Sequence, residues 1–416
     1  MPIISQSYNK DTRMKRILIL GANEKQLQLI KAAKEEGYYV VVCDYTSDNP
    51  GIPLADKHYQ VSYLDQDSVL SIAKKEKING VIGNNDPAMP MVAYISDRLG
   101  LPGNSPETID KLISKSAFRQ FQEQIGLYCP KHIETEDFSV VEKSIENLNY
   151  PIIVKPSVSA GSQGTTKIQA NQTGKLQEVF NTCKGFSRNG KVTIEEYVEM
   201  PTLECIEGDI FVYGDTILWN GLFTTRRSIM APMIPMTYIF PAILSQEKLT
   251  VVKKNVTKLF NEVGIRHGEY NIEMYFTKGE ELFIIEVNPR QGGNLLPQQI
   301  KKHTDIDFTK LLVTTAVGQD EYLDTVMKTE PKNNFLTHHI VFSNVCGILQ
   351  DIEIAPTIRK YVTDISFHKH CGEKINQRNN ATDYIAYVTM QFPDRETQLS
   401  YSRERIEQMI RPIVKE

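Results

Sequence analysis

The first hundred residues alternate short apolar runs with helical stretches. Residues 15–22 read KRILILGA, an apolar run that passes into a glycine and is typical of a buried parallel strand. A helical stretch at 24–36 and a second apolar run at 38–45 follow, which is the spacing of a strand–helix–strand unit with parallel strands. Because the same order continues to about residue 110, the pattern predicts an open, doubly wound α/β domain over 14–110.

The rest of the chain predicts two further domains and one unstructured end. Residues 111–325 carry helices, several strands and a hairpin, whereas residues 326–416 alternate short strands with a terminal helix, which predicts a small α+β domain. Residues 1–13 are polar and aperiodic, and we expect a disordered tail there. At 416 residues, a division into two or three domains agrees with the usual size of a domain.

Composition and charge exclude several classes of protein. Lys and Arg number 47 against 51 Asp and Glu, so the net charge of −4 argues against a nucleic-acid binder that works through bulk charge. No apolar stretch approaches the roughly 20 residues that a bilayer-spanning helix needs, and the N-terminus lacks the apolar core of a signal peptide. The six cysteines include no C-x-x-C pair, which disfavours a zinc ribbon. We expect a cytoplasmic protein without nucleic-acid or membrane partners.

The turn after the first strand argues against a nicotinamide or flavin dehydrogenase. Residues 21–26 read GANEKQ and lack the second glycine that lets a backbone approach a pyrophosphate closely. Asp44, near the end of the second strand, is the residue that would favour such a cofactor, but a solvated carboxylate at a strand end explains it as well.

A run of small residues follows a predicted strand in the central region. The strand ends in Lys155-Pro156, and residues 157–164 read SVSAGSQG. Such a run can lay backbone N–H groups against anionic oxygens, and Lys155 could reach a phosphate as a compact cation. The run is not a Walker A sequence, and taken alone it would fit a flexible surface hairpin.

An acidic hairpin is predicted over 269–290, EYNIEMYFTKGEELFIIEVNPR, where two strand-like runs flank TKGEE. If it turns after the glycine, Glu273 faces Glu286 and Asn271 faces Asn288, and period two places both pairs on one face of the ribbon. Opposed carboxylates about 5 Å apart repel each other, so they require a cation between them. Oxygen ligands favour Mg²⁺ or Mn²⁺, although a solvated sheet face with unfavourable charge pairing would show the same residues.

These features and two further motifs occur in one order along the chain. The motifs are SKSAFR at 114–119, IIVKPSVSAGSQG at 152–164, IEEYV at 194–198, and Glu273 followed by EVNPR at 286–290. In this order and spacing the chain, over about residues 14–325, resembles the ATP-grasp superfamily of ATP-dependent carboxylate–amine and carboxylate–thiol ligases. Carbamoyl-phosphate synthase large chains, biotin carboxylases and bacterial amino-acid ligases are the members it is most similar to in style.

The resemblance implies an architecture and a set of cofactors. The expected architecture is α/β, with a Rossmann-like pre-ATP-grasp domain over 14–110, an ATP-grasp domain over 111–325 that includes a lid subdomain at about 127–197, and the small α+β C-terminal domain over 326–416. The expected cofactors are ATP and Mg²⁺, or Mn²⁺ in its place.

The same resemblance implies roles for individual residues. The residues expected to contact ATP, several of them in a mobile loop over its phosphates, are Lys115, Lys155, Ser157, Ser159, Gly161, Ser162, Gly164, Glu195, Glu196, Val198 and Glu204. Those expected to bind one or two metal ions are Glu273, Glu286 and Asn288. Lys155 and Arg290 would be catalytic, since both could neutralise charge on a phosphoryl group during its transfer.

Substrate contacts are expected at three places. Arg226 and Arg227 could bind a substrate carboxylate, although surface solvation explains them equally well. Asn85 and Asp86 lie in a loop at a strand end, where open α/β sheets bind ligands, but an N-D-P sequence also makes an ordinary turn. His267 precedes the acidic hairpin and could be a structural histidine instead.

The function that the resemblance implies is that of an ADP-forming ligase, which activates a small carboxylate as an acyl phosphate for attack by an amine. Two alternatives stay open: phosphoryl transfer to a bicarbonate-type or other acceptor, and a non-catalytic ATP-binding module. The expected partners are small-molecule carboxylate and amine substrates, and a homodimer is one option for assembly.

Overall fold

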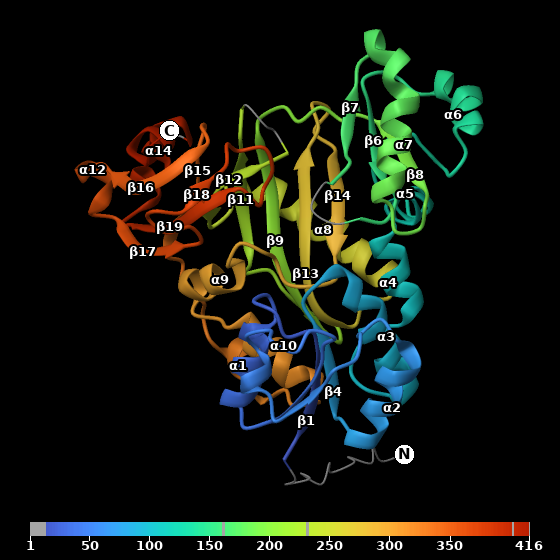
Figure 1. The fold of residues 1–416 in the computed structure, drawn as a ribbon, viewed down its shortest axis with the longest axis vertical. Coiled ribbons are helices and arrows are strands. Elements are labelled where there is room, and N and C mark those ends of the chain that lie inside the picture. The colour runs from blue at the N-terminus through green and yellow to red at the C-terminus, as the bar shows by residue number, and fades with distance from the viewer. Residues whose placement is uncertain (1–13, 160–162, 230–232, 402, 416) are drawn as a thin grey trace. The chain divides into compact units, whose positions relative to one another are not determined.

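The computed structural model describes residues 14–159, 163–229, 233–401 and 403–415 (Figure 1). The tail predicted at 1–13 lies outside the described residues. The chain divides into two compact units, of which the first comprises the residues up to 103 together with 309–324. The second comprises residues 104–308 together with 325–416.

The first unit is built on a four-stranded parallel sheet with the strand order β3-β2-β1-β4. Its strands are β1 (Arg16–Leu20), β2 (Tyr39–Cys43), β3 (Lys57–Tyr59) and β4 (Gly80–Gly83). Its helices are α1 (Leu27–Glu35), α2 (Gln66–Glu76), α3 (Met89–Leu99) and most of α10 (Phe308–Ala316), with 3₁₀ turns η1 (Ile52–Leu54) and η2 (Asp86–Ala88). The doubly wound arrangement predicted from the alternation of apolar runs is confirmed.

Both faces of this sheet are apolar and both are covered. Leu18 and Val41 pack with α2 and α3 on one face, whereas Gly80 on the other face lies against α10. A Cβ at Gly80 would stand 2.2 Å from the carbonyl oxygen of Ala316, so only glycine permits this close approach. Helix α10 therefore completes the first unit, although it comes far later in the sequence.

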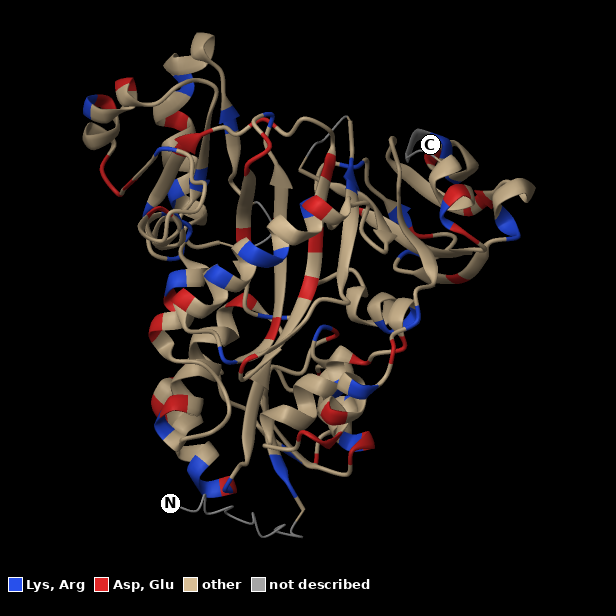
Figure 2. Cartoon of the chain, turned by 180° about the vertical axis from the view of Figure 1, so that it is seen from behind, with Lys and Arg blue, Asp and Glu red and all other residues tan. Residues whose placement is uncertain are grey.

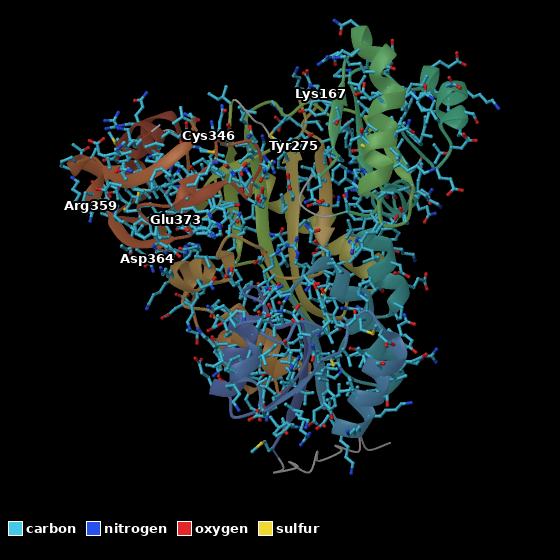
Figure 3. All side chains as sticks on the ribbon, in the orientation of Figure 1. Lys167, Tyr275, Cys346, Arg359, Asp364 and Glu373 are labelled. Atoms are coloured by element: carbon cyan, nitrogen blue, oxygen red, sulfur yellow. The ribbon has the colours of Figure 1, made fainter. Side chains whose placement is uncertain are left out.

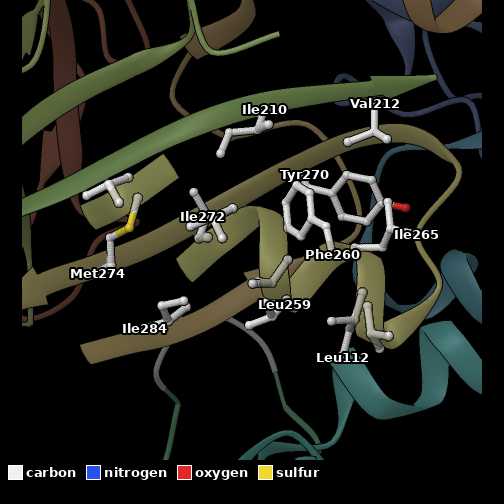
Figure 4. Close-up of a cluster of buried hydrophobic side chains, with 14 of the residues drawn as sticks. Leu112, Ile210, Val212, Leu259, Phe260, Ile265, Tyr270, Ile272, Met274 and Ile284 are labelled. Carbon is white, nitrogen blue, oxygen red and sulfur yellow. The ribbon is translucent and has the colours of Figure 1, made fainter. Parts of the chain in front are cut away.

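The second unit is built on a nine-stranded sheet of antiparallel neighbours, in the order β14-β13-β9-β11-β12-β15-β19-β17 with β10 beside β9. Its strands are β9 (Glu204–Tyr213), β10 (Thr216–Leu218), β11 (Leu222–Arg227), β12 (Pro235–Phe240), β13 (His267–Phe276), β14 (Leu282–Asn288), β15 (Phe335–Phe342), β17 (Val362–Phe367) and β19 (Tyr384–Phe392). One face of β9, β13 and β14 packs against α4 (Pro106–Ile113), α5 (Lys115–Gln124) and α8 (Gln246–Val263). There Ile272 and Met274 join Leu259 and Phe260 in the core, which leaves the alternate side chains of these strands on the opposite face (Figure 4).

A smaller antiparallel sheet lies within the stretch expected to form a lid. Its strand order is β5-β8-β6-β7, and its strands are β5 (His132–Thr135), β8 (Val192–Glu196), β6 (Ile152–Pro156) and β7 (Thr166–Ile168). Helices α6 (Phe138–Ser144) and α7 (Leu176–Phe186), with the turns η3 (Ile145–Asn147) and η4 (Ala170–Lys175), accompany it. Val141 from α6 and Phe180 from α7 form an apolar core with Val154 and Ile194 of the strands.

The C-terminal segment combines strands and helices, as expected of an α+β region. Strands β15, β17 and β19 extend the large sheet, while β16 (Gly347–Ile354), β18 (Lys374–Ile375) and β20 (Ile410–Lys415) form a separate sheet in the order β18-β16-β20. The remaining helices are α9 (Leu296–Thr304), α11 (Glu321–Lys328), α12 (Pro356–Arg359), α13 (Arg395–Ser400) and α14 (Arg403–Met409). No helix in the described parts of the chain is both long and apolar enough to span a bilayer.

The unit boundaries differ from the expected domain boundaries. Helix α4 packs on α5 and β14, with Leu112 in the core of the second unit, so the first unit ends at 103 rather than near 110. Residues 309–324 return to the first unit, because α10 covers one face of its sheet. Both differences depend on packing between segments that are far apart in the sequence, and the local sequence pattern does not show such packing.

Candidate active site

The acidic hairpin forms as predicted at the end where its carboxylates lie. Strands β13 and β14 pair antiparallel, with Asn271 opposite Asn288 and Glu273 opposite Glu286. Directly beyond Glu286, Ile285 is left without a partner, and the register shifts by one residue. The predicted pairing is therefore confirmed around the acidic residues and wrong nearer the turn, where this β-bulge displaces β14 along its neighbour.

A third strand places further acidic residues beside the hairpin. Strand β9 pairs with β13 so that Glu207 lies opposite Glu273 and Asp209 lies opposite Asn271. Glu207, Glu273 and Glu286 thus form a row of carboxylates across three neighbouring strands, which we call the acidic row. Figure 2 shows acidic residues along these central strands. Neither Glu207 nor Asp209 was predicted as a site residue, although their period-two spacing in the sequence CIEGDI was visible.

One buried cation partly neutralises the acidic row. Arg227 Nη2 pairs with Glu273 and lies 3.3 Å from Glu207 Oε1, while Arg227 Nε donates to Cys205 Sγ at 3.2 Å. Burial is the main cause that raises the pKa of Glu207 to about 8, and it also raises the pKa of Glu273. Because Arg227 brings one positive charge to a row of three carboxylates and pairs with two of them, the row can accept a further positive charge.

The donor atoms of the acidic row fit a hard divalent cation. Glu273, Glu286 and Asn288, the residues expected to bind metal, share one face, and Asn288 Nδ2 donates to Glu286 Oε1 at 2.9 Å. Cys205, Glu207 and Glu273 form a group whose potential ligand atoms all lie within 4.8 Å of one another. Burial raises the pKa of the Cys205 thiol, and a neutral thiol is a poor ligand for Mg²⁺, so the oxygen atoms of this group matter more than its sulfur. The metal assignment itself remains a proposal.

A buried ion-pair cluster connects the small sheet with α5. Glu195 accepts hydrogen bonds from Lys155 Nζ and, at 2.9 Å, from Arg119 Nε, and the three side chains are 4%, 8% and 1% exposed. Burial lowers the pKa of Lys155 to about 8. Burial would raise the pKa of Glu195, but Arg119 and Lys155 outweigh it and lower that pKa to about 2. Glu195, expected to line the adenine, thus holds the ammonium group of Lys155 in place.

Arg119 also links this cluster to the large sheet. Its Nη1 and Nη2 donate to the carbonyl oxygens of Ile284 and Ile285 at 3.3 and 2.9 Å, and Gln122 Nε2 donates to Ile284 O at 2.9 Å. Ile285 is the residue that the β-bulge leaves unpaired, so Arg119 satisfies a carbonyl group that the strand ladder does not. Arg119 is part of the SKSAFR motif but was not predicted as a site residue.

Lys115 and the small-residue loop lie together. The backbone N–H of Lys115, the first residue of α5, donates to Ser157 O at 3.0 Å, and Lys115 Nζ lies 3.4 Å from Ser159 Oγ. Of the other loop residues expected to contact ATP, Gly164 has a positive φ of 72°, while Gly161 and Ser162 lie outside the described residues. The described part of the loop therefore carries two serines, Ser157 and Ser159, next to Lys115 of α5 and Lys155 of β6.

Glu196 is the last residue of β8, and Val198 lies on the connection between the small and the large sheet. Glu196 Oε1 accepts hydrogen bonds from the backbone and side-chain N–H groups of Asn149 at 2.9 and 2.8 Å. Val198 O accepts from the hydroxyl of Tyr275, which is labelled in Figure 3, at 2.6 Å, and this bond fixes the connection to β13. Their contacts with a nucleotide remain predictions.

Arg226 and Arg227 face opposite sides of the large sheet, because they are neighbours in β11. Arg227 belongs to the acidic row, whereas Arg226 Nε donates to Glu204 Oε1 at 2.7 Å and its Nη1 to Tyr401 O at 3.3 Å. Glu204, an expected ATP contact, and Arg226, an expected substrate contact, thus neutralise each other. The structure separates two arginines that the sequence places side by side, and only Arg227 lies at the acidic row.

His267 is buried at the start of β13. Its ring lies 5.8 Å from the ring of Tyr213, and burial lowers its pKa to about 4. A histidine that is neutral at physiological pH and packed in this way fits the structural interpretation better than a substrate contact.

We expect His267 to make the protein less stable as the pH falls from 6.5 to 4. Its pKa is about 4 in the folded chain against an ordinary value of 6.5, so the unfolded chain binds a proton that the folded chain does not. The free energy of unfolding keeps this contribution above pH 6.5 and loses it as the pH falls through that window. Denaturant titrations at several pH values give the free energy of unfolding as a function of pH. In His267→Gln, the slope of this free energy against pH should be smaller by up to about 1.4 kcal/mol per pH unit. The matched variant His370→Gln, at an exposed position, should keep the original slope, and an unchanged slope in His267→Gln would contradict the prediction.

Asn85 and Asp86 lie in the first unit, directly after β4. Asn85 Oδ1 accepts a hydrogen bond from Ala88 N at 2.9 Å and caps the 3₁₀ turn η2, in which Asp86 is the first residue. The turn that the N-D-P sequence indicated is therefore present. A role of either residue in substrate binding remains a prediction.

The segment after β14 is fastened to two buried acids. Gly292 N donates to Asp209 Oδ2 at 2.9 Å, and Gln291 Nε2 donates to Glu269 Oε2 at 2.7 Å. A Cβ at Gly292 would stand 2.7 Å from Asp209 Oδ1, so glycine lets the backbone approach the carboxylate. Arg290, the expected catalytic arginine, donates from Nη1 to Gln291 O at 3.0 Å and immediately precedes this fixed turn.

Strands β12, β15 and β19 hold the next part of the same segment. Asn294 Nδ2 donates to the Tyr238 hydroxyl at 2.5 Å, the Tyr387 hydroxyl donates to Asn294 Oδ1 at 2.9 Å, and His338 Nε2 lies 3.0 Å from Asn294 O. Asn294 and Leu295 both have positive φ angles, of 54° and 60°, which non-glycine residues keep only where the surroundings hold them. The C-terminal segment thus fixes the course of the chain beyond the acidic hairpin.

Comparisons with known proteins agree with this architecture. Residues 127–314 match the family model described as D-ala D-ala ligase C-terminus, and residues 17–102 match the PylC-like, N-terminal domain. The chain is 27% identical over 295 residues to the carbamoyl phosphate synthase large chain of Vibrio cholerae, which covers 69% of this chain and 26% of that protein. The chain thus spans about a quarter of the length of this curated relative.

Two solved structures share the fold over nearly the whole chain. The L-amino acid ligase from Bacillus licheniformis has a TM-score of 0.79 at 20% identity, over 97% of this chain and 100% of that one. The biotin carboxylase domain of the 2-oxoglutarate carboxylase from Hydrogenobacter thermophilus, in complex with MgADP, ADP and bicarbonate, has a TM-score of 0.69 at 17% identity, over 97% and 92%. At these identities the likeness shows the fold.

The fold and the matched family models define the class: this is a chain with the ATP-grasp ligase architecture. Within the first unit, residues 17–102 are similar to the PylC-like, N-terminal domain. The resemblance expected from the order of the motifs is therefore confirmed, together with the α/β fold class.

Proposed function

We propose that the chain is an ATP-dependent, ADP-forming ligase that activates a small carboxylate as an acyl phosphate for attack by an amine. The observation that carries this proposal is the acidic row, three carboxylates on one face of the sheet beside a lysine from the small sheet. Lys155 lies close enough to the row for its charge to act on Glu273 and to oppose the rise in that pKa. Carboxylates for a metal and a fixed cation for phosphate would thus act in one site.

The residues of this site fit a magnesium nucleotide. Glu273, Glu286 and Asn288 would hold Mg²⁺, which supplies positive charge to the phosphate oxygens of ATP. Lys155 is held by Glu195, and Lys115 lies at the described part of the small-residue loop, so both would bind phosphate groups as fixed cations. The proposal draws support from the Hydrogenobacter thermophilus neighbour, which was crystallised in complex with MgADP.

The reaction needs positioning and charge neutralisation rather than covalent chemistry by the protein. A carboxylate oxygen of the substrate attacks the terminal phosphorus of ATP, the bond to the bridging oxygen breaks, and ADP leaves. Arg290, placed directly before the turn that Asp209 and Glu269 fasten, would neutralise the phosphoryl group during transfer. An amine then attacks the acyl carbon, loses a proton and releases inorganic phosphate.

A hydroxylamine trap tests the proposal. The chain is incubated with Mg-ATP, hydroxylamine and a panel of small carboxylates, and both ADP and hydroxamate are measured. We expect at least one carboxylate to give equal amounts of the two products, since hydroxylamine intercepts the acyl phosphate. A rise in melting temperature with Mg-ATP but no ADP release with any acceptor would favour the non-catalytic alternative.

A second candidate function is phosphoryl transfer to a bicarbonate-type acceptor. It is favoured by the neighbour from Hydrogenobacter thermophilus, which was crystallised with bicarbonate beside MgADP and whose fold matches 97% of this chain. In the same assay, ADP release that rises with bicarbonate and yields no hydroxamate with any carboxylate would favour this candidate over the first.

A further inference from the structure

The second unit contains a cavity of about 300 Å³ that is lined by both polar and apolar side chains. It is bordered by the end of β15, by the segment that follows β18, and by β20 with the preceding helix. Its walls combine apolar side chains, such as Phe342 and Val414, with the charged side chains of Arg378 and Glu407. None of these residues takes part in the site described above.

The cavity lies on the side of the large sheet that faces away from the acidic row. His339 lines it, whereas His338, its neighbour in β15, lies opposite Tyr238, and Tyr238 lies opposite Thr225. Thr225 in turn pairs with Cys205, which is on the same face of β9 as Glu207. Because consecutive residues of a strand point to opposite faces, the cavity is distinct from the candidate active site.

The backbone holds Arg378 at the edge of this cavity. Arg378 N donates to Ser343 O at 2.8 Å, and Gln377 N donates to Cys346 Sγ at 3.3 Å, so two bonds fasten this segment to the turn after β15. Cys346 marks that turn in Figure 3. The guanidinium is thus presented by a fixed piece of backbone rather than by a free loop.

The charge of Arg378 has no acidic partner among the described residues. Its Nη1 lies 3.2 Å from Met236 Sδ, and its Cζ lies 5.9 Å from the centre of the Phe342 ring. Neither a thioether nor an aromatic ring neutralises a cation, and a partly buried charge without a counter-ion is less favourable than a paired one. An anion in the cavity would supply that counter-ion, and a guanidinium binds a carboxylate through two parallel hydrogen bonds.

The other lining residues restrict the chemistry of this anion. Arg378, Arg411 and Glu407 together give the lining one net positive charge, which a ligand with one negative charge balances better than a doubly charged phosphate ester. The apolar side chains of Phe342, Ile410 and Val414 favour a ligand with an apolar body over a small inorganic ion. We propose that the cavity binds a small organic carboxylate with an apolar body, with its carboxylate paired to Arg378.

The test uses 3-phenylpropionate as the probe and the full-length chain labelled with ¹³C at its methionine methyl groups. Met236 lines the cavity, so its methyl resonance, assigned with Met236→Leu, should shift as the probe is added. Arg378→Gln should weaken binding by about tenfold or more, since it removes one charge-assisted pair. Arg359→Gln, which changes an exposed arginine of the same unit, should leave the affinity unchanged.

Several controls make the outcome decisive. Val414→Trp keeps Arg378 and places a large side chain in the cavity, so it should abolish the shift. Glu286→Gln in the acidic row should retain the shift, which separates this site from the proposed active site. 3-Phenylpropanol, which keeps the apolar body without the charge, should bind at least about tenfold more weakly. The proposal is overturned if the probe leaves the Met236 resonance in place at millimolar concentration, if the alcohol or inorganic phosphate binds as tightly, or if Arg378→Gln keeps the original affinity.

Discussion

Replacing Glu286 with glutamine is expected to lower ATP turnover by about a hundredfold or more, because it removes a charged oxygen ligand from the acidic row. Glu286 stands opposite Glu273 on the hairpin, and Glu207 completes the row on the next strand. The variant keeps the size and shape of the side chain, so the change is one of charge. Turnover is measured as ADP release under the conditions that give hydroxamate.

The same substitution should leave the fold intact. Glu286 is only half-buried, and its carboxylate faces that of Glu273, so glutamine relieves a repulsion between like charges. The free energy of unfolding should therefore stay the same or rise by a few tenths of a kcal/mol, roughly the size of a cross-strand charge term. Glu281→Gln, at an exposed position of the same hairpin, is the matched control and should keep full turnover.

The dependence on Mg²⁺ distinguishes a metal ligand from a merely nearby residue. If Glu286 binds the metal, the variant should need a higher Mg²⁺ concentration for half-maximal rate, whereas the control should not. Wild-type turnover in Glu286→Gln, with an unchanged Mg²⁺ dependence, would remove Glu286 from the proposed mechanism.

The pairing of the acidic hairpin could be predicted because its two strands are neighbours in the sequence. Period two and a short turn suffice to set Glu273 against Glu286. The third carboxylate, Glu207, could not be found in this way, because its strand β9 is far from β13 in the sequence. Asp209 and Asn271, which lie opposite each other on these two strands, are 62 residues apart. The pairing of β9 with β13 is a choice among many possible partners, and only the packed sheet decides it.

The same limit explains why Arg119 was not predicted as a site residue. Its carboxylate partner, Glu195, is 76 residues away, and its carbonyl partner at Ile285 exists only because a β-bulge leaves that residue unpaired. A bulge has no strong sequence signal here, since LFIIEVN contains neither glycine nor proline. Motif order could indicate the class of site, but not which charges within it neutralise one another.

Replacing Glu195 with glutamine is expected to lower the free energy of unfolding by about 3–5 kcal/mol, because it leaves two buried cations without a carboxylate. Lys155 and Arg119 are 8% and 1% exposed, so water cannot take over the role of the lost charge. Urea unfolding of the variant and the parent chain measures the difference. Glu196→Gln is the matched control: its carboxylate bonds the exposed Asn149, and it should cost less than about 1 kcal/mol.

Glu195→Gln should also weaken ATP binding, and the pH dependence of the KM for ATP identifies the cause. Burial already lowers the pKa of Lys155 to about 8, and Glu195 is the group that opposes this shift. Without that carboxylate the pKa of Lys155 should fall further, so that the ammonium loses its proton within the working pH range and no longer attracts phosphate. The KM for ATP in Glu195→Gln should therefore rise with pH, starting from a lower pH than in the parent chain. A KM raised equally at every pH would mean that Glu195 acts through packing alone, and an unchanged KM would show that Lys155 does not bind ATP phosphates.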